Sequence, residues 1–285
     1  MKSFLRRYQI IIFFALTVII SWYPWYTGGH GFRTWGPSLA GLIVVAVVGG
    51  WKGIVEMLRR LVKWRVGIVW WAVALLGPPA IALVAIGIHV LAGGEAPGFL
   101  MWKQEPYLVP VLMLIMLLPM QGPGGEEPFG WRGYAQPRLQ EKWGQWGPLI
   151  ASLIIGTAWA VWHLPEFFDP TSAQYAIGMA GFVPLIIMEI ANSIFMTWLY
   201  IKTGGSVLVA GVLWHLMADT SAATLFLDFT VTGMFAGEAI PAADIGLINM
   251  DTVVMAAAAL ILVIATRGRL GYSAKDEEVC SRGQV

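Results

Sequence analysis

Long apolar segments separated by short polar loops dominate this chain. The runs that are long enough to be helices crossing a bilayer lie at residues 8–26, 37–53, 66–91, 106–121, 148–164, 176–201, 205–227 and 247–266. The fourth and fifth runs are short for an untilted crossing of about 30 Å, which is typical of a broken or tilted helix. The pattern predicts an all-α fold, a polytopic transmembrane helical bundle of about eight spans.

Composition supports this prediction and narrows the classes of partner. Apolar residues make up 58% of the chain and charged residues 12%, and the mean hydropathy is +0.69, which excludes a water-soluble globular domain. A net charge of +1 leaves no basic excess to neutralise phosphates, so nucleic acid is excluded as a partner. Without a repeat, a low-complexity stretch or a long linker, residues 1–285 are expected to form a single domain in the lipid bilayer.

The distribution of basic residues predicts the orientation of the bundle. Of the 18 Lys and Arg residues, only Arg33 and Lys103 fall in loops on the side opposite the N-terminus. Since cytoplasmic loops carry the excess of Lys and Arg, both termini are predicted to lie in the cytoplasm.

Ionisable residues inside apolar helices are costly in lipid and usually face a cavity, so they are the candidates for function. The candidates are Glu126, Glu127 and Arg132 after the fourth span, His163 at the end of the fifth, Glu189 in the sixth, and His215 and Asp219 in the seventh. His89, in the third span, has no carboxylate near it in sequence and is expected to be structural or interfacial.

The richest segment begins with Gly122-Pro-Gly-Gly, which breaks the fourth span. Glu126 and Glu127 then open a new helix, whose positive dipole end favours negative charge. They are either site residues or interfacial helix-start residues paired with Arg132. To meet the other candidates, this helix must begin well inside the bilayer and run back to the interface near Arg138 and Lys142, as a water-filled cavity open to the cytoplasm would permit.

Two further segments each place a histidine beside a possible partner on one helical face. His163 follows Trp159 by four residues, and Pro165 closes that helix. His215 and Asp219 are also four residues apart, so both side chains project from one face about ten residues into their span. An unpaired carboxylate at that depth costs several kcal/mol, so Asp219 is expected to be paired, hydrated or protonated.

These three segments, in this order over about residues 105–225, resemble the CPBP family, which contains the type II CAAX prenyl endopeptidases and bacterial bacteriocin-processing or immunity proteins. The resemblance implies an intramembrane endopeptidase that needs no metal cofactor, in which Glu126, assisted by Glu127 and His163, activates a water molecule. His215 and Asp219 would polarise the scissile carbonyl and stabilise the oxyanion. Arg132 would hold the second carboxylate.

Two departures from the family pattern affect these assignments. Four residues rather than three separate the glutamate pair from Arg132, so the base is Glu126 if the extra residue follows the pair, and Glu127 if positions are counted back from Arg132. We prefer Glu126. Asp219 stands where well-studied members have asparagine, so it is expected either to be protonated or to hold His215 in position.

Three alternatives stay open at the level of sequence. The chain could be a catalytically silent membrane scaffold or bacteriocin immunity protein. It could be a metal-dependent peptidase that binds zinc through Glu126, His163, His215 and Asp219, because carboxylate and imidazole suit zinc. Glu189 and the broken fourth helix would also fit a transporter, although no inverted repeat is visible. The motif context looks bacterial, which predicts a bacterial cell membrane protein acting on a membrane-associated or lipophilic peptide or on a membrane protein.

Overall fold

The computed structural model describes residues 2–29, 31, 33–117, 127–170, 172–236, 238 and 244–273, and all regular elements among them are helices. The longer helices are α1 (Lys2–Ser21), α3 (Gly36–Leu61), α4 (Ile68–Leu91), α9 (Gly147–Trp162), α11 (Phe182–Lys202) and α14 (Ile245–Ala265). The shorter helices are α2 (Tyr23–Tyr26), α5 (Leu100–Gln104), α6 (Val109–Met116), α8 (Gln136–Gln140), α10 (Ala173–Ile177), α12 (Trp214–Ser221) and α13 (Val231–Ala236). Three π-helical segments are η1 (Phe129–Ala135), η5 (Leu208–Leu213) and η6 (Ala222–Phe226), and three 3₁₀ turns are η2 (Gly144–Trp146), η3 (Leu164–Phe168) and η4 (Met179–Gly181).

Seven of the helical stretches are long and apolar enough to cross a membrane, which confirms the prediction of a polytopic helical bundle. They are Phe4–Ser21, Gly36–Leu61, Ile68–Leu91, Gly144–Phe168, Met179–Lys202, Leu208–Phe226 and Ile245–Ala265. Each coincides with one of the predicted spans. The remaining predicted span, at residues 106–121, contains α6, and its residues from 118 onward lie outside the described residues.

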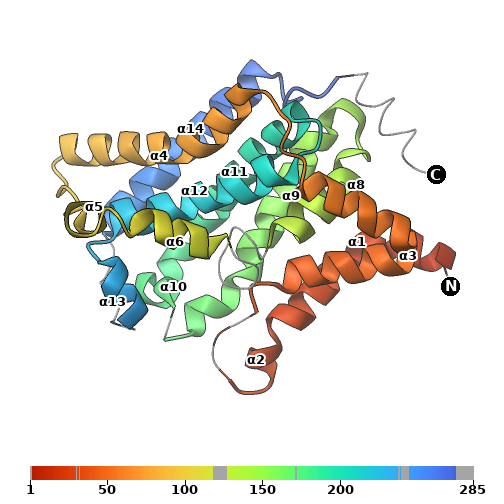
Figure 1. The fold of residues 1–285 in the computed structure, drawn as a ribbon, viewed down its shortest axis with the longest axis horizontal. Helices are drawn as coiled ribbons and strands as arrows, with labels where there is room; N and C mark the ends of the chain where they lie inside the picture. Colours follow the sequence, from red (N-terminus) through yellow and green to blue (C-terminus); the bar gives the residue numbers. More distant parts are fainter. Residues whose placement is uncertain are drawn as a thin grey trace.

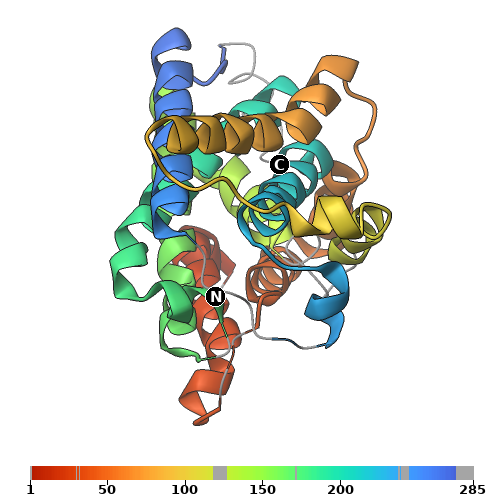
Figure 2. The same ribbon diagram turned by 90° about the vertical axis from the view of Figure 1, so that its left-hand side faces the viewer.

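The central helices are those that carry the candidate residues. Helices α9, α11 and α12 occupy the middle of the bundle, with α1 and α3 on one side and α4 and α14 on the other (Figure 1). Helix α11 packs on both α9 and α14, and α3 packs on α1 and η1. Figure 2 shows α14, in blue, crossing α4, in gold, at the end of the molecule away from α1, in red. Glu189 of α11 and His215 of α12 are accordingly buried.

Close helix contacts are made at glycines, while large apolar side chains face outward. A Cβ atom on Gly156 of α9 would lie 2.5 Å from Ile190 Cα of α11, and one on Gly130 of η1 would lie 2.2 Å from the Pro37 carbonyl oxygen of α3. On α14, Ile261 is 67% exposed. Because lipid tails are as apolar as leucine, helices in a membrane associate through such close packing rather than through burial of apolar area.

Helix α3 is longer than predicted because it continues through a kink. The expected span ended at residue 53, but the helix extends to Leu61. Gly50 has φ +59°, a left-handed backbone conformation that glycine adopts without a steric penalty. The kink separates an apolar half from the half that carries Arg59 and Arg60.

The two ends of the bundle carry opposite charges. At the end where α1 begins, Arg60 Nη1 donates to Tyr200 Oη at 3.1 Å and Lys63 Nζ donates to the Gly204 carbonyl at 2.7 Å. At the opposite end, Glu105 accepts from the backbone N–H of Thr232 at 3.0 Å. Basic residues at the end where α1 begins fit the predicted orientation, with the N-terminus in the cytoplasm, which stays a prediction.

His89 contributes to the acidic end in the structural role expected for it. Its side chain is buried, and Nε2 lies 3.1 Å from Asp244 Oδ2. Asp244 caps α14 by accepting from the N–H groups of Gly246 and Leu247. The contact thus joins the end of α4 to the start of α14.

Candidate active site

The segment that begins at Glu127 is a helix buried between other helices, and it runs in the direction expected. Residues 128–140 form one continuous helical stretch through η1 and α8, about 20 Å long at about 1.5 Å per residue. Near its start, Trp131 packs edge-on against Phe13, with centroids 5.6 Å apart, and against Trp162 at the far end of α9, at 6.1 Å. Its last residue, Gln140, lies against Gly147, the first residue of α9. The helix therefore starts deep in the bundle and returns to the end where α9 begins.

Arg132 is fully buried and is held by a polar network. Its Nη1 donates to Gln136 Oε1 and to Ser193 Oγ, both at 3.2 Å. Thr197 Oγ1 also donates to Gln136 Oε1, at 3.0 Å, so the network ties the Arg132 helix to α11. Its Nε and Nη2 are buried without a hydrogen-bond partner among the described residues. The acidic groups that act on Arg132 electrostatically are Glu189 and Glu127.

Glu127 is buried at 4% exposure, and its Oε2 accepts from Trp131 Nε1 at 3.2 Å. Its predicted partnership with Arg132 stays a prediction. Glu126, the preferred base, lies outside the described residues.

His163 is oriented by the backbone of its own helix. It is the residue at which α9 ends, followed by Pro165 in the first turn of η3. Its Nδ1 lies 2.9 Å from the Trp159 carbonyl oxygen. A carbonyl oxygen only accepts, so Nδ1 carries the hydrogen and the lone pair of the neutral ring is on Nε2. The ring therefore presents Nε2 as a base.

His215 and Asp219 form the pair that their spacing predicted. His215 Nε2 lies 3.4 Å from Asp219 Oδ2. The His215 side chain is 7% exposed, whereas that of Asp219 keeps 41% exposure because it opens into a cavity. The pair lies on α12 between the π-helical segments η5 and η6, and π-helical distortions occur frequently at functional sites.

Trp159 brings the three segments together. Its ring is edge-on to the His215 ring, with centroids 4.9 Å apart, and tilted to the His163 ring at 6.4 Å. The Arg132 guanidinium lies 5.9 Å from the Trp159 centroid. Glu127 joins through Trp131 and Trp162, since the Trp162 ring contacts the His163 ring at 4.7 Å. The structure thus gathers the described candidate residues from η1, α9 and α12 into one cluster.

A cavity of about 100 Å³ adjoins this cluster between α4, α11, α12 and α14. Its polar lining comes from Glu189, Asn192, Asp219, Ser221 and Asp251. Asn192 accepts from Trp214 Nε1 at 3.0 Å, which fixes the residue preceding His215. Glu189, one of the candidate residues inside an apolar span, lines the same cavity as Asp219.

Sequence reasoning did not select Glu166, Asp251 or Asn192. Glu166 Oε2 is buried without a hydrogen-bond partner among the described residues, and Asp219 acts on it electrostatically. Its spacing of three from His163 was an available signal. So was the presence of Asp251, an acid inside the last apolar span. Asn192 gave no signal, because a single amide in a long helix belongs to no motif.

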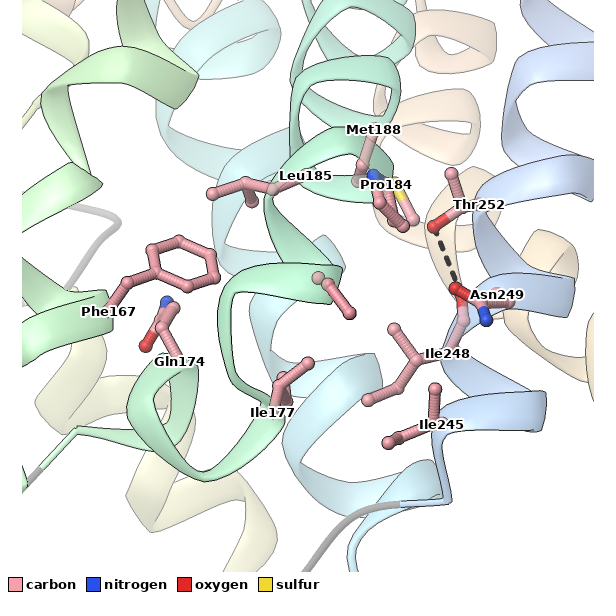
Figure 3. A pocket seen from close by; sticks show the side chains of 12 residues that line it. Phe167, Gln174, Ile177, Pro184, Leu185, Met188, Ile245, Ile248, Asn249 and Thr252 are labelled. Carbon is pink, nitrogen blue, oxygen red and sulfur yellow. Dashed lines mark hydrogen bonds between the residues drawn. The ribbon is translucent and has the colours of Figure 1, made fainter.

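A second, apolar pocket of about 200 Å³ lies between η3, α10, α11 and α14 (Figure 3). Phe167, Leu185 and Ile248 point into it from three different elements. Met188 lines both this pocket and the acidic cavity, so the two adjoin.

The described residues neither support nor exclude the zinc-binding alternative. Among them, no three His, Cys, Asp or Glu side chains are grouped as metal ligands. The proposed zinc set includes Glu126, which lies outside them.

Comparisons with known proteins support the resemblance read from the motifs. Residues 106–221 match the family model described as type II CAAX prenyl endopeptidase Rce1-like. A curated relative, the "CAAX prenyl protease 2" of Methanococcus maripaludis, is 24% identical over 241 residues, covering 75% of this chain and 83% of that protein. The matched family region starts just before α6 and ends with α12, so it contains the whole cluster around Trp159.

Proposed function

We propose that this chain hydrolyses a peptide bond of a membrane-associated or lipophilic peptide. Its residues 106–221 match the Rce1-like family of type II CAAX prenyl endopeptidases. The observation that carries the proposal is the convergence of His163, His215 and Asp219 with the Glu127 helix around Trp159. Peptide hydrolysis needs a base, a water molecule and preorganised donors in one small cavity. The chain is an integral multi-pass membrane protein, and we propose that it lies in a bacterial cell membrane.

The base is a glutamate of the 126–127 pair working with His163. Water attacks the scissile carbonyl carbon, its proton passes to this base, the C–N bond breaks, and the proton is delivered to the leaving amine. The orientation of His163 supports this role, because the Nδ1 contact with the Trp159 carbonyl puts the basic lone pair of the neutral ring on Nε2. We keep Glu126 as the base and Glu127 as its assistant, held by Trp131.

His215 is the oxyanion donor, and Asp219 is its counter-ion. With an Nε2–H that faces Asp219, the ring can donate from Nδ1 as well only when it is protonated. An ionised Asp219 favours the protonated ring. This gives the unusual aspartate a positioning role and keeps its charge on the far side of the imidazole from the oxyanion.

The apolar pocket supports a lipophilic substrate. Its 200 Å³ adjoin the acidic cavity through Met188, and small apolar pockets with a few convergent polar groups are typical of substrate sites. The CAAX prenyl protease name belongs to the relative. For this chain we propose only the broader class of lipophilic peptides.

The test compares the purified wild type with Glu126→Gln, Glu127→Gln and His163→Ala for cleavage of a mixed peptide library in detergent micelles. The control is Glu95→Gln, an exposed acid in a loop remote from the site. Loss of a general base typically costs about 10²- to 10⁴-fold, so we expect that fall in Glu126→Gln and His163→Ala, a smaller fall in Glu127→Gln and none in the control. Equal rates in all proteins would refute the assignment, and a larger fall in Glu127→Gln would move the base by one residue.

The same assay separates the alternatives. A zinc peptidase loses activity in a chelator and regains it with zinc, whereas the proposed mechanism resists chelation. A silent scaffold cleaves no library peptide in any variant.

A further inference from the structure

The acidic cavity beside His215 is lined by carboxylates from three different helices. Glu189 comes from α11, Asp219 from α12 and Asp251 from α14. The described residues that line it include no Lys, Arg or His. Its volume of about 100 Å³ is several times the roughly 10–15 Å³ that a single water requires. There is room for a small charged group.

Two of these carboxylates have oxygens that no described residue satisfies. Glu189 is 8% exposed, and its Oε2 is buried without a hydrogen-bond partner. Asp251 Oδ1 is likewise buried without a hydrogen-bond partner among the described residues. Leaving a buried carboxylate oxygen unpaired is costly. Both acids come from helices outside the three motifs, so the chemistry assigned to Glu126, His163 and His215 does not account for them.

The basic groups near these acids are His215 and Arg132. His215 faces Asp219 at 3.4 Å. Arg132 acts electrostatically on Glu189, but no ion pair between them lies within 4 Å among the described residues. Its Nη1 donates to Gln136 and Ser193, whereas its Nε and Nη2 are buried without a hydrogen-bond partner among the described residues. Since the lining brings three acids and no base, a cation entering from outside would be complementary to the cavity.

The cation is organic rather than a metal ion. No group of His, Cys, Asp or Glu among the described residues has the arrangement of a metal site. The remaining wall is apolar, with Ala82, Phe226 and Met255 facing the acids. An alkyl stem ending in an ammonium or guanidinium group matches both surfaces, since such side chains bury the stem and pair the head.

We propose that Glu189 and Asp251, beside Asp219, form a specificity subsite that takes the Lys or Arg side chain of a substrate residue close to the scissile bond. This rests on the proposed peptidase function, because Asp219 links the cavity to His215. The substrate class then becomes a peptide with an apolar portion in the pocket of Figure 3 and a cationic residue in the acidic cavity.

Binding is tested first, without any need for catalysis. Purified protein in detergent is heated with propylguanidinium chloride, with propylurea as the neutral analogue and with NaCl at equal ionic strength. Only propylguanidinium should raise the Tm, saturably and by about 3 °C at ten times its Kd. The rise should disappear in Glu189→Gln and in Asp251→Asn and persist in Asp228→Asn, an exposed acid outside the cavity.

A wild type that propylguanidinium does not stabilise would overturn the subsite, as would an equal rise in both cavity variants or with NaCl. Using two conservative variants keeps the test valid if one of them does not fold.

Cleavage is tested second, with peptide pairs that differ only by Lys or norleucine at single positions around the bond. We expect about a tenfold preference in kcat/KM for Lys at one position, falling to about twofold in Glu189→Gln. Cleavage without this preference would overturn the subsite while leaving the peptidase in place. Stabilisation by propylguanidinium without any cleavage would confirm a cation site and refute the peptidase.

Discussion

Replacing Asp219 with asparagine tests whether its charge supports His215. The change removes the negative charge while keeping the shape and an oxygen that can accept from His215 Nε2, now 3.4 Å from Oδ2. If the carboxylate is the counter-ion of a protonated His215, the variant loses the electrostatic part of that contact and keeps the geometric part.

The magnitude follows from the difference between the two kinds of hydrogen bond. A bond to a charged group is worth about 1.5–3 kcal/mol and a neutral one about 0.5–1.5 kcal/mol. The contact is longer than the roughly 2.7–2.9 Å of a strong charge-assisted bond, and the Asp219 side chain is 41% exposed to the cavity. The low end of the difference therefore applies, about 1 kcal/mol, which corresponds to about a fivefold lower kcat/KM.

The decrease should appear in kcat rather than in KM, because the oxyanion exists only in the transition state. The assay is steady-state cleavage of the best library peptide by the wild type, Asp219→Asn and Asp219→Ala, with Asp228→Asn as the control. The alanine variant should fall further, since it also loses the acceptor. Activity of Asp219→Asn at or above that of the wild type would refute the counter-ion role and show that the carboxylate repels the oxyanion.

Three further variants test the packing that positions the site. Gln136→Leu removes three buried hydrogen bonds, at about 0.6 kcal/mol each in a membrane, so unfolding in detergent should be easier by about 2 kcal/mol; an unchanged Tm would contradict the network. Gly156→Ala places a Cβ 2.5 Å from Ile190 Cα, whereas Gly87→Ala meets nothing within 4 Å. Only Gly156→Ala should therefore lower the free energy of unfolding, by about 1–3 kcal/mol, and equal losses in both variants would contradict the close approach. The pKa of Asp244 is lowered by hydrogen bonds from the Leu247 and Gly246 N–H groups and by the nearby His89. The Asp244 carboxylate therefore stabilises the folded protein above its unfolded pKa near 4, and this stabilisation is lost as the pH falls through the lower folded value. Asp244→Ala should lower the Tm at pH 7 and progressively less in more acidic solution, and a pH-independent difference would contradict the cap.

The spans were predictable from sequence because each depends on one local property, a long apolar run. Their ends were less so. The kink at Gly50 lets α3 continue beyond the predicted residue 53, since glycine can reverse its φ within a helical run. The first predicted span, 8–26, comprises α1 and the separate short helix α2, divided at Trp22.

The site was predictable only as far as residues shared a motif. His215 and Asp219 sit one turn apart, so their proximity follows from helix geometry alone. The contact of Trp159 with His215 joins two helices and depends on their packing, which no periodicity encodes. The same holds for Asp251, which lines the cavity of Asp219 from α14, and for Asp244, which contacts His89 from far along the chain.

The depth of the site limits how a substrate can reach it. His163 follows the sixteen residues of α9, so it lies about 24 Å from the cytoplasmic end in the predicted orientation. The Trp22 indole N–H donates to the Trp162 carbonyl just before it, at the end of α1 farthest from the N-terminus. Glu189 and Asp251 are likewise close to the non-cytoplasmic ends of their helices. The cavity open to the cytoplasm stays a prediction, and its path would have to cross most of the bilayer, whereas the acidic end of the bundle lies close to the acidic cavity. A cationic peptide drawn toward that end would have the shorter route, so the acidic residues there would favour the class of substrate proposed for the subsite.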